Sequence, residues 1–209
     1  RMMAISKFSC PVILYRMVSV LLLCCWMSTA QAKPPGNLSV GVCKQDITPV
    51  TPALAEAYKA QFGEAKAANH TDPIYIAGFG NDRQATGYND RLWARGVVID
   101  GRGGRIALVA LDLIGYFNNQ IEIVREMVGD DIDYLIVQSS HSHEGPDTLG
   151  IWGPDELTTG VDAGYLDFVN DAIADCIVEA GKNISQCLSV GVVEMYRQLL
   201  DRHNGTNRI

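Results

Sequence analysis

The stretch from Arg105 to Val137, RIALVALDLIGYFNNQIEIVREMVGDDIDYLIV, decides the fold class. Residues 105–114 form a nearly continuous apolar run, which predicts a strand buried on both faces of a sheet. Residues 118–128 carry apolar side chains at helical spacing, with Asn118 or Asn119 as the expected cap. Residues 134–137 predict a second buried strand. This order of strand, helix and strand indicates a parallel pair joined by a crossover.

The flanking sequence adds further elements around this unit. Residues 92–99 predict a strand that reaches the first apolar run through a glycine-rich hairpin at 100–104. Residues 161–180 carry one long apolar stripe and predict the longest helix, which Gly181 is expected to cap. Also expected are a strand at 38–43, a helix at 53–62, an ordered loop at 69–90 and a strand at 188–193. The predicted class is α/β: a mixed sheet covered by helices, forming part of a domain.

The N-terminal residues have the pattern of a secretory signal. Basic residues precede an apolar run at 17–27, and the small residues Ala30 and Ala32 follow it. We therefore expect a signal peptide at 1–32, a secreted or periplasmic protein, and the incomplete N-terminal portion of a domain at 33–209. A short membrane anchor is the alternative for the same segment. The first residue is not Met, and the chain stops after a polar turn, so we expect a fragment of a longer protein.

Composition and charge exclude several classes of protein. The chain has 209 residues, of which 47% are apolar and 20% charged, and its net charge is −7. These values are typical of a globular domain rather than a disordered chain. The acidic balance argues against a nucleic-acid partner, which would require a basic face. No window after residue 32 is apolar enough to span a bilayer.

Three cysteines follow the predicted signal: Cys43, Cys176 and Cys187. An oxidising compartment would allow one disulfide and leave one thiol. We expect Cys176 and Cys187 to pair because they lie close together in the sequence. No Cys-x-x-Cys spacing is present, so a structural zinc knuckle is not supported.

The candidate site follows the strand at 134–137. The sequence continues QSSHSHEGPD, which places His141, His143, Glu144 and Asp147 beyond the carboxyl end of that strand. Ligands of open α/β sheets bind at such ends. In an extended backbone, two histidines separated by one residue lie on the same side. They could hold one metal together, or one could bind the metal while the other moves protons.

Other polar residues admit two interpretations. Asp112 lies within the apolar run, where it either orients a histidine or bonds to a nearby loop. Arg91 and Arg95 either hold substrate or pair with Asp82 and Asp90, and pairing is favoured. His70 and His203 stand alone in the sequence, and we interpret both as surface residues.

The motif His141-Ser-His143-Glu-Gly-Pro146 resembles the H-T-H-S-G-P motif of the neutral, non-lysosomal ceramidases. Three upstream segments resemble that family in the same order: Ala77–Gly80 (AGFG), the stretch from Asp90 to Gly96, and Arg105–Gly115 (RIALVALDLIG). The opening segment 41–49 also fits. Together these motifs cover roughly residues 38–180.

The resemblance implies a zinc-dependent amidase that cleaves the N-acyl bond of ceramide. It implies that His141 is a zinc ligand and that His143 transfers protons or orients the metal-bound water. Asp112 remains a further candidate from its position within the apolar run alone. The implied mechanism is attack by zinc-activated water on the amide carbonyl. The implied partner is a ceramide-like lipid amide, with transient contact at a membrane surface. The family's other ligands, a second His, a Glu and a Tyr, lie downstream and have no counterpart in this chain.

Two departures from the family separate this chain from a typical ceramidase. Glu144 replaces a small hydroxyl residue, and the stretch 147–154 replaces a glycine-rich one. The substrate is therefore described as ceramide or a related lipid amide. One alternative is another His-x-His metallohydrolase. The metallo-β-lactamase pattern fails, because Gly145 and Pro146 stand where Asp and His are needed. The other alternative is an exported fragment that binds a lipid or a partner without turnover.

Overall fold

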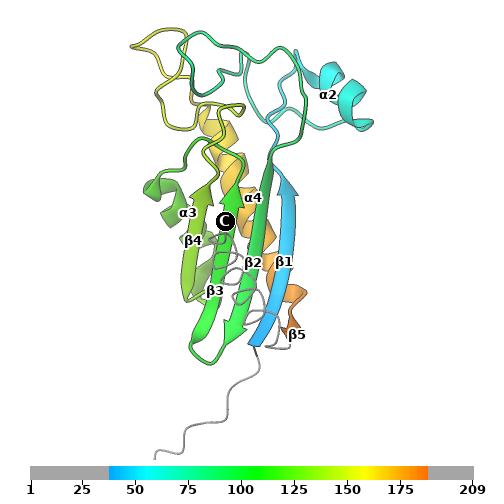
Figure 1. The fold of residues 1–209 in the computed structure, drawn as a ribbon, viewed down its shortest axis with the longest axis vertical. Coiled ribbons are helices and arrows are strands. Elements are labelled where there is room, and N and C mark those ends of the chain that lie inside the picture. The colour runs from blue at the N-terminus through cyan, green and yellow to red at the C-terminus, as the bar shows by residue number, and fades with distance from the viewer. Residues whose placement is uncertain (1–37, 188–209) are drawn as a thin grey trace, which may run out of the picture. The chain divides into compact units, whose positions relative to one another are not determined.

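The computed structural model describes residues 38–187, which form a five-stranded mixed sheet with helices on it (Figure 1). The strand order is β4-β3-β2-β1-β5. The strands are β1 (Leu38–Asp46), β2 (Trp93–Gly101), β3 (Gly104–Leu111), β4 (Tyr134–Ser139) and the short β5 (Ser185–Cys187). The helices are α2 (Ala55–Phe62), α3 (Asn118–Val128), α4 (Ala163–Lys182) and the single 3-10 turn η1 (Gly129–Asp131). The mixed sheet with covering helices confirms the coarse fold prediction.

The predicted strand–helix–strand unit is present. β3 and β4 are parallel, with Ile106 opposite Tyr134 and Leu111 opposite Ser139, and α3 is the crossover between them. All other strand pairs are antiparallel, and β2 and β3 form the expected hairpin. Consequently the carboxyl ends of β1, β3 and β4 meet the amino end of β2 at one edge of the sheet.

The sheet is buried on one face only, which corrects the prediction of a strand buried on both. Ala107, Val109 and Leu111 of β3 are buried, whereas the residues between them are partly exposed. On β4 the side chain of Leu135 is buried and that of Ile136 is 51% exposed. This alternation has the period of a strand with one covered face. An apolar run alone does not distinguish the two situations, because Ala and Leu occur on both faces of β3.

Helices α3 and α4 pack together on that covered face (Figure 1). The predicted stripe of α4 is confirmed, since Tyr165, Val169, Ile173 and Ile177 are all buried. Asp162 caps α4 by accepting a hydrogen bond from the backbone N–H of Tyr165 at 2.8 Å. Both predicted caps differ from the structure, because α4 continues past Gly181 to Lys182 and α3 starts without a side-chain cap.

The disulfide joins Cys43 of β1 to Cys176 of α4, so the predicted Cys176–Cys187 pair is wrong. Cys176 lies on the buried stripe of α4, which packs against β1. Cys187 belongs to β5, the outermost strand beside β1. Closeness in sequence was a poor guide here, because tertiary packing brings the more distant cysteine to Cys176.

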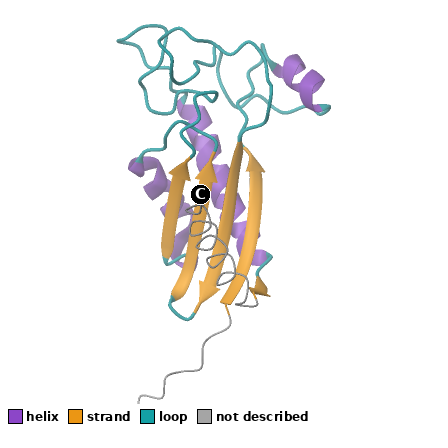
Figure 2. Cartoon of the chain, in the orientation of Figure 1, coloured by secondary structure: helices purple, strands orange, loops and turns teal. Residues whose placement is uncertain are grey.

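Loops gather at the edge where three strands end (Figure 2). They include the predicted long segment at 69–90 and the segment at 140–162, while α2 stands apart from the sheet. No helix within residues 38–187 is long and apolar enough to cross a membrane. The predicted signal at 1–32, the strand at 188–193 and His203 lie outside the described residues.

Candidate functional site

The two histidines of the motif follow β4 directly, and their loop extends the pairing of the parallel strands. The backbone N–H of Ser140 donates to the carbonyl of Leu111 at 2.8 Å, and that of Ser142 donates to the carbonyl of Leu113 at 3.1 Å. The loop is therefore held against the segment that follows β3. The parallel pair predicted from the sequence is what places His141 and His143 at the sheet edge.

His141 has a left-handed backbone, with φ of 60°. Its Nδ1 lies 2.9 Å from the carbonyl oxygen of Ile114. A carbonyl can only accept a hydrogen bond, so Nδ1 carries a proton, and whenever the ring is neutral its lone pair lies on Nε2. Metal-binding histidines are oriented by such a bond from the other ring nitrogen.

The ring of His143 lies in an aromatic surround. Its centroid is 5.1 Å from that of His141, 5.1 Å from that of Phe79 and 6.2 Å from that of Trp152. Its Nδ1 is buried and has no hydrogen-bond partner. The structure thus brings the two predicted imidazoles together. It also leaves Nδ1 of His143 buried without a hydrogen-bond partner.

The backbone of Gly78 lies directly against this ring. A Cβ atom built on Gly78 would stand 1.8 Å from Nδ1 of His143, and its φ is +83°. Only glycine combines that conformation with that closeness. Gly78 belongs to the Ala-Gly-Phe-Gly segment of the family resemblance, but nothing in the sequence showed which residue it would contact.

The two carboxylates of the motif do not join the histidines. The Glu144 side chain is 74% exposed and accepts two hydrogen bonds from Arg83, at 2.7 and 2.8 Å. Asp147 is 1% exposed and accepts hydrogen bonds from the backbone of the loop that follows it. Its four donors are the N–H groups of Leu149, Gly150, Trp152 and Gly160. Asp147 therefore organises the loop that carries Trp152.

Asp112 lies beside Arg95. Its carboxylate accepts from Arg95 Nη1 at 2.8 Å and from the backbone N–H of Trp93 at 3.0 Å. No contact between Asp112 and a histidine occurs among the described residues. Both partners of Asp112 belong to strand β2, so its hydrogen bonds in this structure go neither to a histidine nor to a loop.

The remaining predictions about single residues need correction. His70 is buried, not on the surface: its Nδ1 donates to the carbonyl of Thr71 at 2.6 Å, and its ring contacts Tyr165. The two arginines are paired as expected, but with other partners. Arg91 binds Asp46 and Glu64, whereas Arg95 binds Asp112. The fold brings these partners, rather than the predicted Asp82 and Asp90, within reach of the two arginines.

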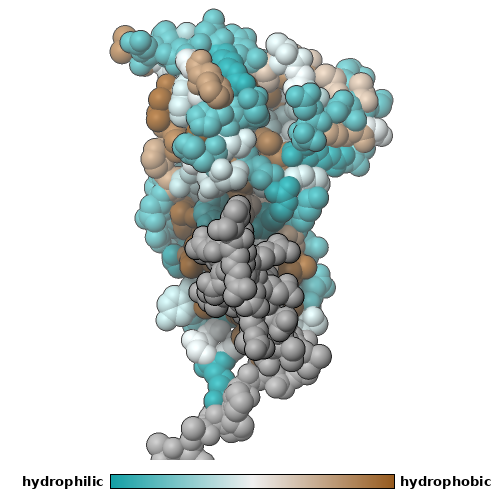
Figure 3. Space-filling view, viewed as in Figure 1, coloured by the Kyte–Doolittle hydropathy of each residue, from teal (hydrophilic) through white to brown (hydrophobic). Residues whose placement is uncertain are grey.

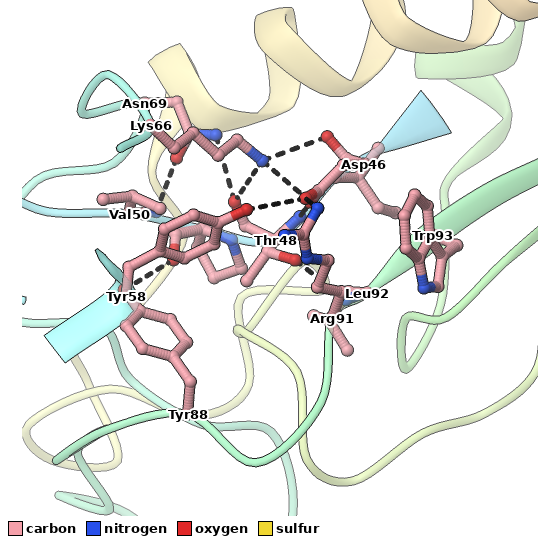
Figure 4. A network of polar contacts seen from close by, with 12 residues as sticks. Asp46, Thr48, Val50, Tyr58, Lys66, Asn69, Tyr88, Arg91, Leu92 and Trp93 are labelled. Carbon is pink, nitrogen blue, oxygen red and sulfur yellow. Dashed lines mark hydrogen bonds and ion pairs between the residues drawn. The ribbon is translucent and has the colours of Figure 1, made fainter. Parts of the chain in front are cut away.

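A polar network at the end of β1 fixes the segments beside the site (Figure 4). Asp46 accepts hydrogen bonds from Tyr58 at 2.8 Å, from Lys66 at 2.9 Å and from the backbone of Thr48 at 2.8 Å. Burial acts to raise the pKa of Asp46, but these hydrogen bonds outweigh it and hold that pKa below its ordinary value. Burial and the Asp46 carboxylate together raise the pKa of the Tyr58 hydroxyl. The ionised carboxylate therefore anchors three separate segments.

A cleft of about 590 Å³ opens between these segments and the histidine loop. Residues 83–90 and 144–146 line it, and Ile74, Ile76 and Leu92 contribute apolar surface. Its volume is in the range of cavities that bind small molecules. Arg83 and Glu144 line it, and Arg83 also donates to the backbone carbonyl of His143 at 2.7 Å.

The donors present fit a metal in part. The Nε2 lone pair of the neutral His141 ring suits zinc, whereas the unpartnered Nδ1 of His143 is covered by the backbone of Gly78. However, catalytic zinc takes three protein ligands, and no group of three such side chains occurs within residues 38–187. The described residues can therefore supply part of a zinc site and not the whole of it.

Comparison with known proteins relates this chain to one fold. No family model and no curated protein matches the sequence. The chain is structurally similar to the neutral ceramidase of Pseudomonas aeruginosa, with a TM-score of 0.51 and 19% sequence identity. A ceramidase complexed with C2 gives a TM-score of 0.52 and 18% identity. Each comparison covers 72% of this chain and 22% of the solved one. The chain thus shares the fold of part of neutral ceramidase, as a partial domain.

Proposed function

We propose that this chain is part of an exported zinc-dependent hydrolase that cleaves the N-acyl amide bond of ceramide or a related lipid amide. One observation carries the proposal: the His141–His143 pair stands at the sheet edge with His141 already oriented by the Ile114 carbonyl. The similarity in fold to neutral ceramidase supports the same class of substrate. The ligands still needed would come from beyond the described residues.

His141 would contribute to holding the zinc in this proposal. Bound zinc supplies an activated water and polarises the amide carbonyl. The bond from His141 Nδ1 to Ile114 keeps Nε2 in its lone-pair form and fixes the ring. His143, held among Phe79 and Trp152, would move the proton or orient the attacking water. Asp112 would act indirectly, by fixing the backbone at Trp93.

The loops around the site offer a surface for a lipid partner. Phe79 is 80% exposed, Ile151 58% and Leu157 98%. Figure 3 shows scattered hydrophobic residues among hydrophilic ones on the loop-bearing end. Since the chain is acidic, we propose transient contact with a zwitterionic rather than an anionic membrane. The Cys43–Cys176 disulfide supports an oxidising, exported location.

The test is hydrolysis of short- and long-chain N-acyl sphingosines by the full-length protein, with zinc content measured in the same samples. We expect His141→Ala to lower kcat/KM by about a hundredfold or more and to reduce bound zinc. Lys59→Ala, an exposed side chain of α2, is the control and should leave both unchanged. Full activity and full zinc content in His141→Ala would contradict the proposal.

A lipid-binding role without turnover is the second candidate, and the cleft favours it. The cleft of about 590 Å³ combines polar side chains with the apolar surface of Ile74, Ile76 and Leu92, so it can hold the polar end of a lipid without any reaction. Binding of a fluorescent N-acyl sphingosine separates the two. If wild type and His141→Ala bind it equally and neither hydrolyses it, the binding role stands. If wild type hydrolyses it and His141→Ala only binds it, the hydrolase stands.

A further inference from the structure

Arg83 connects the loop beneath His143 to the backbone of His143 itself. Its Nη1 donates to the carbonyl of His143 at 2.7 Å and lies 3.4 Å from that of Ala77. Its Nη2 donates to both oxygens of Glu144, at 2.8 and 2.7 Å. Its Cζ lies 5.4 Å from the ring centroid of Phe79. The Arg83 guanidinium therefore lies against both the segment 77–79 and the segment 143–144.

The packing beneath the ring leaves little room for adjustment. The buried Gly78 backbone lies directly against Nδ1 of His143, and Phe79 adopts a φ of 61°, which is unusual for a bulky side chain. Such a backbone persists only when surrounding contacts hold it. The backbone bond from Ala77 N–H to the Gly145 carbonyl at 3.0 Å supplies one such contact. The Arg83 side chain adds others, since it lies against the segment carrying Gly78 and donates to the segment carrying His143.

We propose that Arg83 is a positioning residue for His143 and that Glu144 anchors the Arg83 side chain. The consequence for catalysis rests on the proposed function above, whereas the effect on the ring of His143 does not. The proposal also explains the departure at residue 144. A small hydroxyl residue offers one neutral oxygen on a shorter side chain, whereas the Glu144 carboxylate accepts from Nη2 with both of its charged oxygens.

The hydrogen bond from Arg83 to His143 and the ion pair between Arg83 and Glu144 differ in strength. The bond from Arg83 to the His143 carbonyl is partly buried, and the Arg83 side chain is 32% exposed. The Glu144 side chain is 74% exposed, so its ion pair is weakened by water and salt. Arg83 should therefore matter much more than Glu144. Lysine should replace Arg83 only in part, because it lacks the planar fork that reaches two partners at once.

The experiment follows the imidazole rings by ¹⁵N-histidine NMR in the full chain. In Arg83→Ala we expect the ring nitrogens of His143 to shift and broaden, while those of the buried His70 stay unchanged. Arg83→Lys should restore the His143 signals in part, and Glu144→Gln should change them least. Thermal unfolding of each variant shows whether it is folded. If Arg83→Ala does not fold, Arg83→Lys and Glu144→Gln carry the test. Unaltered His143 signals in every folded variant would overturn the proposal.

Kinetics on N-acyl sphingosine give the second readout. Misplacing a reacting group costs rate rather than binding, so Arg83→Ala should lower kcat by about tenfold or more and leave KM within about twofold. The Arg83→Ala/Glu144→Ala variant should be no slower than Arg83→Ala, because Glu144 acts through Arg83. If the wild type has no activity but His143 still shifts in Arg83→Ala, the proposed function fails and the positioning role stands. An active wild type with unchanged kcat and unchanged ring signals in Arg83→Ala refutes the positioning role alone.

Discussion

Breaking the disulfide should remove a large part of the stability of residues 38–187. Cys43 and Cys176 are separated by 133 residues, so the bond closes a long loop in the unfolded chain. The loop-closure relation gives about 5 kcal/mol for a loop of that length at 25 °C. Whole domains are stable by only about 5–15 kcal/mol. We therefore expect the reduced protein to be close to the limit of folding.

The assay is urea unfolding followed by tryptophan fluorescence, with and without reductant, for wild type and for Cys43→Ala/Cys176→Ala. Both the reduced wild type and the double variant should lose about 3–5 kcal/mol of unfolding free energy. Cys187→Ala is the matched control and should behave like the oxidised wild type. A midpoint that does not move on reduction would refute the reasoning. So would peptide mapping that finds Cys176 bonded to Cys187.

Three further predictions concern the residues that hold the site edge. Asp147→Ala removes the acceptor of four backbone N–H groups and should cost about 3 kcal/mol, with faster proteolysis within 147–160. Tyr165→Phe leaves the carbonyl of Ile47 without its buried donor and should cost about 1–2 kcal/mol by urea unfolding. Because the folded-state pKa of Asp46 lies below its ordinary value of 3.8, its stabilisation is present above that pH and is lost as pH falls through the folded pKa. Asp46→Asn should remove this acid dependence of Tm below about pH 4, and an unchanged pH profile in that variant would contradict it.

The parts of the fold that the sequence predicted are those with local causes. The helical spacing within 118–128 and the long stripe of α4 each specify one element and its buried side. The crossover rule then makes the strands parallel, which sends the residues after Ser139 to the sheet edge. The position of the His-x-His motif followed from these steps alone.

The parts that failed depend on partners far away in the chain. His70 looks like an isolated polar residue in sequence, yet its Nδ1 bonds to Thr71 and its ring packs on Tyr165 of α4. Arg91 has an aspartate beside it in sequence, but the fold pairs it with Asp46 at the end of β1. Burial and pairing of polar groups depend on packing between elements, which no local pattern reports.

The candidate site combines both kinds of cause. His141 and His143 reach the edge because β4 runs parallel to β3, a local property of one strand–helix–strand unit. The orientation of each ring comes from a distant segment: the Ile114 carbonyl for His141, and Gly78 with Arg83 for His143. A motif search can therefore find the two imidazoles but not the groups that orient their rings. It follows that a change at Gly78 or Arg83 should disturb the site while leaving every residue of the His-x-His motif intact.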